Sequence, residues 1–218
     1  MNNLFERVKS VGFDLDNTLY PINEEIENRI RVRFAEVALE KRPDLKSVEV
    51  AREFFEKRYN EIGSRTQVLK ELGFPNPEAV SKECLVKAEF LDLLKYDRKV
   101  VSLLTNIKRK YGTFLITAVP KNLSIPKLEK IGLSLSLFDY SSFGDNPEGN
   151  NKLNGSVYMH FLSQSEYSSD QHVYIGDSLK GDIIPAKKLG MKTIAVGKEI
   201  EEADFSVDEI SDIEGLLL

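Results

Sequence analysis

Cysteine and histidine are scarce in this sequence. Cys84 is the single cysteine among 218 residues, so no intrachain disulfide can form and no cysteine cluster can hold zinc. We predict that Cys84 is a buried, structural thiol. The two histidines, His160 and His172, lie too far apart in sequence to suggest a metal-binding pair, and we expect both to be structural.

Long hydrophobic runs and an excess of basic residues are also missing. No stretch approaches ~20 apolar residues and residues 1–7 lack the apolar run of a signal peptide, so we expect a soluble, cytoplasmic protein without a membrane partner. The 30 Lys and Arg are outnumbered by 35 Asp and Glu, which gives a formal net charge of −5. Because a phosphate backbone is usually bound by a basic face, a nucleic acid polymer is not an expected partner.

The order of apolar patterns indicates two kinds of structure. Residues 11–16 form a short apolar run that ends in carboxylates, as expected of a buried strand followed by a loop. Residues 24–110 carry apolar side chains every three or four positions on a charged background, which predicts four or five helices. After residue 111 the pattern predicts strands at 113–117, 140–143, 172–175, 193–196 and 205–207, and helices at 125–130, 157–164 and 182–189.

Strands that alternate with helices form a parallel sheet covered on both faces. We therefore predict an α/β core domain made of residues 1–20 and 111–218, with a helical domain of residues 21–110 inserted into it. Ligands of such sheets bind at the carboxyl ends of the strands.

Two aspartates follow the first predicted strand, in the stretch Asp14-Leu15-Asp16-Asn17-Thr18. If the strand continues to Asp16, both carboxylates point the same way, because side chains in a strand repeat every second residue. Two such acids repel each other unless a cation or a proton lies between them. A capped turn with solvated acids is the alternative interpretation.

A second pair of aspartates follows the predicted strand at 172–175. Asp177 and Asp182 lie in the stretch Gly176-Asp177-Ser178-Leu179-Lys180-Gly181-Asp182. Asp182 could instead cap the next helix, a common place for Asp. Taken together, however, four acids at the ends of two parallel strands make an oxygen-rich site that suits Mg²⁺, which prefers a few carboxylates together with water and substrate phosphate.

The two acidic stretches, Phe13–Tyr20 and Gly176–Asp182, resemble the first and fourth motifs of the haloacid dehalogenase superfamily. The resemblance extends over nearly the whole chain, because the intervening segments fall in the family's order. It implies a Rossmann-like parallel sheet core with an inserted all-helical cap. The activity it implies is that of a magnesium-dependent phosphatase acting on a phosphomonoester.

The resemblance implies a role for each acid. Asp14 would be the nucleophile that forms an aspartyl-phosphate, and Asp16 would protonate the leaving oxygen and then activate water. Asp14, Asp177 and the backbone carbonyl of Asp16 would bind Mg²⁺, with Asp182 as a further ligand or as a hydrogen-bonding partner of the ligands. The cation would offset the repulsion between an anionic nucleophile and an anionic phosphate.

The family's second motif is a Ser or Thr at the end of the next core strand. Thr117 fits, and its hydroxyl would bind a phosphate oxygen, with Ala118 beside it in the substrate-binding loop. The stretch at 103–106 resembles the same motif, but residues 107–112 indicate that it belongs to a helix that precedes the strand.

The third motif is a lysine that neutralises the phosphate and the nucleophile. Lys152 fits by its position, although the family commonly has Lys-Pro there and Leu153 follows Lys152 in this chain. Lys121 and Lys127 are the alternatives for this role.

The helical region resembles the family's cap, which closes over the site, excludes water and supplies specificity residues. Residues 59–69 are similar to a cap segment of members that include pyrimidine 5′-nucleotidases. There, Gly63 would allow a tight turn near the substrate and Arg65 would reach a substrate anion. A solvated arginine is the alternative interpretation of Arg65.

The expected partner is a small phosphorylated metabolite, either a nucleotide or a sugar phosphate. Two other functions remain open: a phosphomutase of the same superfamily, which would carry the same acids, and a non-catalytic phosphate-binding module. Degenerate members of the family usually lose one or more of the acids, and this chain keeps all four. The sequence leaves monomer and homodimer open.

Overall fold

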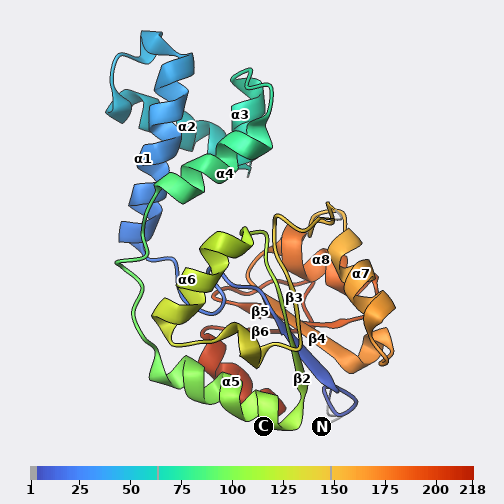
Figure 1. The fold of residues 1–218 in the computed structure, drawn as a ribbon. Helices are drawn as coiled ribbons and strands as arrows, with labels where there is room; N and C mark the ends of the chain where they lie inside the picture. Colours follow the sequence, from blue (N-terminus) through green and yellow to red (C-terminus); the bar gives the residue numbers. More distant parts are fainter. Residues whose placement is uncertain (1–3, 63, 148) are drawn as a thin grey trace. The chain divides into compact units, whose positions relative to one another are not determined.

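The structure is a computed structural model that describes residues 4–62, 64–147 and 149–218 (Figure 1). Gly63, expected to form a turn near the substrate, lies outside the described residues. The chain divides into two compact units, one made of Met1–Pro21 with Leu94–Leu218 and the other of Ile22–Leu93.

The first unit is built on a six-stranded sheet in which every pairing is parallel. The strand order is β3-β2-β1-β4-β5-β6, so the first strand in sequence lies at the middle of the sheet. The predicted α/β fold with a parallel sheet is confirmed. The strands are β1 Ser10–Phe13, β2 Gly112–Ile116, β3 Tyr140–Ser142, β4 His172–Gly176, β5 Lys192–Val196 and β6 Phe205–Val207.

The register of the central strands decides where the functional side chains emerge. Phe13 at the end of β1 lies opposite Leu115 of β2 and Ile175 of β4. The residues that follow these three strands therefore leave the sheet at the same edge. From β1 the chain runs outward through β2 to β3 and then returns to β4 on the other side of β1, and ligands bind at such a switch point.

Helices cover both faces of this sheet. Figure 1 shows α5 and α6 on one side of it and α7 and α8 on the other. Asp97 begins α5 by accepting hydrogen bonds from two backbone N–H groups, and apolar residues at helical spacing bury one face of that helix. The helices of this unit are α5 Arg98–Lys110, α6 Lys121–Ile131, α7 Ser156–Gln164, α8 Ile184–Lys188 and α9 Glu214–Leu217, and a π-helical turn, Leu179–Ile183, precedes α8.

A glycine in the central strand makes room for the core on the α7 and α8 side. A Cβ added at Gly12 would lie 2.0 Å from a ring carbon of Phe114. The Phe114 ring in turn stacks on Phe161 of α7, with 3.9 Å between ring centroids. A side chain at residue 12 would therefore displace an aromatic cluster that packs the sheet against α7.

We expect the substitution Gly12→Ala to lower the free energy of unfolding by about 1–3 kcal/mol, the usual cost of overpacking a core. Gly112→Ala is the matched control, because it lies in the neighbouring strand and a Cβ there would meet nothing closer than 3.7 Å. Denaturant titration of both variants measures the difference. Equal stability of the two variants would contradict this account of the Gly12 site.

The second unit is all-helical over its described residues. Its helices are α1 Glu24–Lys41, α2 Val48–Ile62, α3 Arg65–Glu71 and α4 Pro77–Lys87. The side chains of Asn23, Ser64 and Asn76 cap the N-termini of α1, α3 and α4. Cys84 is buried in α4, as expected of a structural thiol, and burial raises its pKa to about 11. Among the described helices none is long and apolar enough to cross a membrane.

Two boundaries differ from those expected from sequence. The helical unit ends at Leu93 rather than at residue 110, so α5 belongs with the sheet. The reason is that α5 buries Val100, Leu103 and Ile107. Residues 103–106, which resemble the second motif, lie inside this helix, as expected from residues 107–112. In addition, β1 ends at Phe13 rather than continuing to Asp16.

Candidate active site

Asp14 is the first residue after β1. Its backbone N–H still bonds to the carbonyl oxygen of Ile175 at the end of β4, at 2.9 Å, which anchors Asp14 where the two strands end. The side chain is only 6% exposed. Burial raises the pKa of the Asp14 carboxyl to about 8, although Lys152 opposes the shift; Asp182 adds to it.

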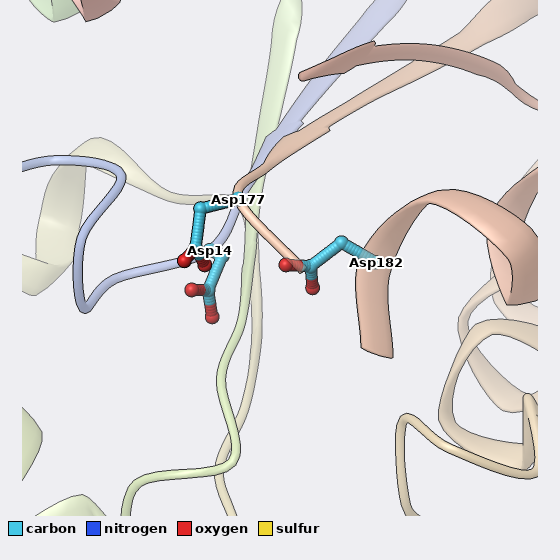
Figure 2. Close-up of side chains that lie close together, drawn as sticks. All are labelled: Asp14, Asp177 and Asp182. Atoms are coloured by element: carbon cyan, nitrogen blue, oxygen red, sulfur yellow. The ribbon is translucent and has the colours of Figure 1, made fainter. Parts of the chain in front are cut away.

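Three carboxylates meet at this edge of the sheet. Asp14, Asp177 and Asp182 each offer an oxygen within 4.8 Å of the others. In Figure 2 the carboxylates of Asp14 and Asp177 lie together where their strands end, and that of Asp182 points toward them from the start of a helix. Clustered carboxylates without nitrogen or sulfur ligands match the preference of Mg²⁺, so the donor set fits this cation.

Asp182 is the most deeply enclosed of the three carboxylates. It is fully buried and accepts hydrogen bonds from the Ser178 backbone N–H, at 2.9 Å, and from the Tyr158 hydroxyl, at 3.4 Å. A Cβ at Gly176 would lie 2.4 Å from its carboxyl carbon, so only glycine fits there. The alternative that Asp182 caps a helix is wrong, because the Ser178 hydroxyl caps this turn by accepting from the Gly181 N–H.

Asp177 is held by a residue of the loop after β1. The Asn17 side-chain amide donates to Asp177 at 2.9 Å. Asn17 has a φ of 59°, a left-handed conformation that asparagine tolerates better than most residues. Burial raises the pKa of Asp177, which the Asn17 hydrogen bond counteracts.

Lys152 brings a positive charge into the carboxylate cluster. Its ammonium lies 2.7 Å from Asp14 Oδ1 and also forms an ion pair with Asp182. Burial lowers the pKa of Lys152, but these two carboxylates outweigh it and raise the pKa above its ordinary value. Leu153, which replaces the family's proline, is 72% exposed and leaves this arrangement intact.

The Asp16 carboxylate lies apart from this cluster, in a second ion pair. Lys127 of α6 contacts both of its oxygens, at 2.8 and 3.0 Å, and the Tyr20 hydroxyl donates to it at 2.6 Å. The expectation that the Asp14 and Asp16 carboxylates point the same way depended on a strand that reached Asp16. Since β1 ends at Phe13, the condition is not met.

Thr117 and Ala118 follow β2 at the same edge of the sheet. The Thr117 backbone N–H bonds to the Ser142 carbonyl at the end of β3, and its hydroxyl accepts a hydrogen bond from the Val119 N–H at 3.1 Å. Thr117 is buried, whereas Ala118 is exposed. Position and burial agree with the predicted motif, and the binding roles of both residues stay predictions.

Arg65 begins α3 in the helical unit. Its guanidinium forms an ion pair with Glu27 and lies 4.7 Å from the ring centroid of Tyr59 and 5.6 Å from that of Phe34. These contacts, all inside the helical unit, give Arg65 a structural role within that unit. Recognition of a substrate anion by Arg65 stays a prediction.

Four further side chains contact the aspartates, and none of them is assigned this role from the sequence. Asn17 and Tyr20 belong to the first motif, and their spacing from Asp16 was the available signal. From sequence, Lys127 is only an alternative to Lys152 for the third motif, and nothing in the sequence marks Tyr158 as part of the site. Their contacts with Asp177, Asp16 and Asp182 join elements distant in sequence, except for Tyr20, which is four residues from Asp16.

The central parallel sheet and the aspartates that follow β1 and β4 define the haloacid dehalogenase (HAD) class of α/β proteins. A profile of the haloacid dehalogenase-like hydrolase family matches residues 11–196, and the chain belongs to this family. The resemblance drawn from the two acidic motifs is therefore confirmed, and the chain is a hydrolase of this type.

Relatives of known description agree with this assignment. A glyceraldehyde 3-phosphate phosphatase from Methanopyrus kandleri is 29% identical over 221 residues, covering 95% of this chain and 92% of the relative. A HAD phosphatase from Thermococcus onnurineus has a TM-score of 0.68 at 21% identity, with 96% of this chain and 98% of that chain covered. YfnB from Bacillus subtilis, solved bound to magnesium, has a TM-score of 0.65 at 16% identity, with coverages of 97% and 99%. These two structures share the fold of this chain.

Proposed function

We propose that this protein is a magnesium-dependent phosphatase that hydrolyses a small phosphomonoester through an aspartyl-phosphate intermediate. The observation that carries the proposal is the cluster of buried Asp14, half-buried Asp177 and buried Asp182, with the Lys152 ammonium paired to Asp14 and Asp182. Such a cluster combines a nucleophilic carboxylate, cation ligands and a fixed positive charge at one point. The non-catalytic alternative is disfavoured, because a phosphate-binding module has no need of this complete set.

Two transfers make up the proposed reaction. An Asp14 oxygen bonds to phosphorus while the bond to the leaving oxygen breaks, and Asp16 gives that oxygen a proton. Asp16 then takes a proton from water, whose oxygen attacks phosphorus and releases Asp14. Lys152 keeps Asp14 oriented and offsets negative charge on the phosphate, and the Thr117 hydroxyl binds a phosphate oxygen.

Asp14, Asp177 and the backbone carbonyl of Asp16 would hold the cation. Asp182 would support it as a ligand or through the hydrogen bonds that fix the loop after β4. When bound, Mg²⁺ supplies charge stabilisation to the transferring phosphoryl group.

For the substrate we propose a small sugar phosphate in preference to a nucleotide. The Methanopyrus kandleri relative, named as a glyceraldehyde 3-phosphate phosphatase, aligns over 95% of this chain. A panel of triose, hexose and nucleoside phosphates tests this preference by comparing kcat/KM. Release of inorganic phosphate, rather than isomerisation of a sugar phosphate, separates the phosphatase from the phosphomutase alternative.

Removal of divalent cations is expected to stop the reaction. In excess EDTA, hydrolysis of p-nitrophenyl phosphate should fall by at least about 100-fold, because electrostatic stabilisation of the transferring group is typically worth that much. Phosphate release is measured before chelation, after it, and after Mg²⁺ is restored in excess over the chelator. Full activity in EDTA would eliminate the metal-dependent mechanism, and recovery with Mg²⁺ distinguishes loss of the cation from damage to the protein.

A further inference from the structure

Two side chains from different elements hold the Asp16 carboxylate, one four residues and the other 111 residues further along the chain. Lys127, in α6, contacts both carboxylate oxygens, and the Tyr20 hydroxyl contacts one of them. Tyr20 is placed by its own segment, since Asp16 and Tyr20 also form a backbone bridge. The Asp16 carboxylate is thus held by two side chains that lie outside the Asp14, Asp177 and Asp182 cluster.

Lys127 occupies an unusual environment for a lysine. Lys127 is only 7% exposed, and lysines are almost never buried unless they are paired. The Asp16 side chain is more open, with 26% of its surface exposed. Lys127 is therefore buried in the protein, while the Asp16 carboxylate keeps access to solvent.

Such an arrangement suits a group that must act on a reacting oxygen from a fixed place. General acid–base catalysis requires the carboxylate to lie within hydrogen-bond reach of the reacting oxygen. A displacement of about 1 Å can cost a reaction roughly 100-fold. Two hydrogen bonds from Lys127 and one from Tyr20 restrict the rotation of the Asp16 carboxylate in the way that this requirement demands.

We infer that Lys127 and Tyr20 are positioning residues that orient the Asp16 carboxylate toward the leaving oxygen of the substrate. The inference rests on the proposed function, in which Asp16 transfers that proton. Neither residue touches the substrate in this account. If they act by positioning, their effect on kcat/KM is larger for a substrate whose leaving group needs a proton. A purely structural role would affect all substrates equally.

Two substrates of different leaving-group chemistry provide the test. Nitrophenolate is a stable anion that departs without a proton, whereas an alkoxide from an alkyl phosphate needs one. For Lys127→Met, kcat/KM for glycerol phosphate should fall roughly 10-fold or more, a fraction of the 10²–10⁴ that acid–base catalysis contributes. For p-nitrophenyl phosphate it should stay within about threefold, because kcat/KM reports the steps up to phosphoryl transfer.

Tyr20→Phe removes a different hydrogen bond to the same carboxylate and should lower the ratio of kcat/KM for glycerol phosphate to that for p-nitrophenyl phosphate, as Lys127→Met does. It decides the question alone if Lys127→Met does not fold, as judged by circular dichroism. Lys130→Met is the matched control: Lys130 is exposed in the last turn of α6, and its variant should leave both values unchanged.

Equal losses on both substrates, or no loss on either, would overturn the inference. An equal change in Lys130→Met would also overturn it, since the effect would then belong to the helix rather than to the Asp16 contact. Wild-type protein with Mg²⁺ is assayed first on both substrates. If it releases phosphate from neither, the proposed function has failed, and that result is distinct from an unchanged ratio in an active enzyme.

Discussion

The substitution Asp14→Asn is expected to lower turnover of any phosphomonoester by at least about 10⁴-fold, because it removes the nucleophile on which the covalent route depends. Asparagine has nearly the same shape and carries no charge. In this variant the Lys152 ammonium keeps its ion pair with Asp182, so the fold should stay intact. Steady-state phosphate release measures the activity, and circular dichroism with thermal unfolding measures the fold.

The matched control for this variant is Asp208→Asn, which changes an exposed aspartate. Its activity should equal that of the wild type. Trapping of radioactive phosphate on the protein during turnover tests the intermediate directly, since label should be found on the wild type and be absent from Asp14→Asn. Substantial residual turnover, or equal labelling of both proteins, would refute Asp14 as the nucleophile.

A second large effect is expected for Lys152→Met. The Lys152 ammonium pairs with two carboxylates, both buried, and its loss leaves Asp14 and Asp182 without this counter-charge. Breaking a buried ion pair from one side typically costs about 3–5 kcal/mol of stability. Activity should fall about 10²–10³-fold, the usual consequence of losing a group that stabilises charge on the reacting centre.

Stability and activity must be measured separately for this variant. Denaturant titration gives the free energy of unfolding, and kcat/KM is measured at a temperature where the variant is folded. Lys121→Met is the control, because Lys121 was an alternative for the same role and is exposed at the start of α6. A larger loss of activity in Lys121→Met than in Lys152→Met would reassign the third motif.

The sequence predicted the parts of the site that lie on short motifs. Asp14 and Asp177 each follow an apolar run that becomes a central strand, and such runs are readable because both faces of a parallel sheet are buried. The helical nature of residues 24–110 was also readable from its periodicity. The boundary between the two units could not be read from the sequence. The reason is that α5 has the same periodic pattern as the helices before it but belongs to the unit that contains the sheet.

The sequence did not predict the pairing of Lys127 with Asp16. Position along the chain favoured Lys152 for the third motif and left Lys121 and Lys127 as alternatives, whereas the structure pairs Lys152 with Asp14 and Lys127 with Asp16. The packing of Tyr158 against Asp182 had no local signal either, since the two residues are 24 positions apart. Contacts of this kind depend on how α6 and α7 are placed beside the sheet.

The sequence by itself determined the class of fold, the motifs at the carboxyl ends of the central strands and the family to which the chain belongs. Fold class, motifs and family can be read from short segments, because hydrophobic periodicity and motif spacing are properties of a few neighbouring residues. Tertiary structure alone decided that the Asp16 carboxylate lies apart from the other acids and pairs with Lys127, and that Lys152 pairs with Asp182 as well as with Asp14. Side-chain pairing depends on ångström-scale distances between elements, and those distances are set by the packing of the whole sheet and its helices.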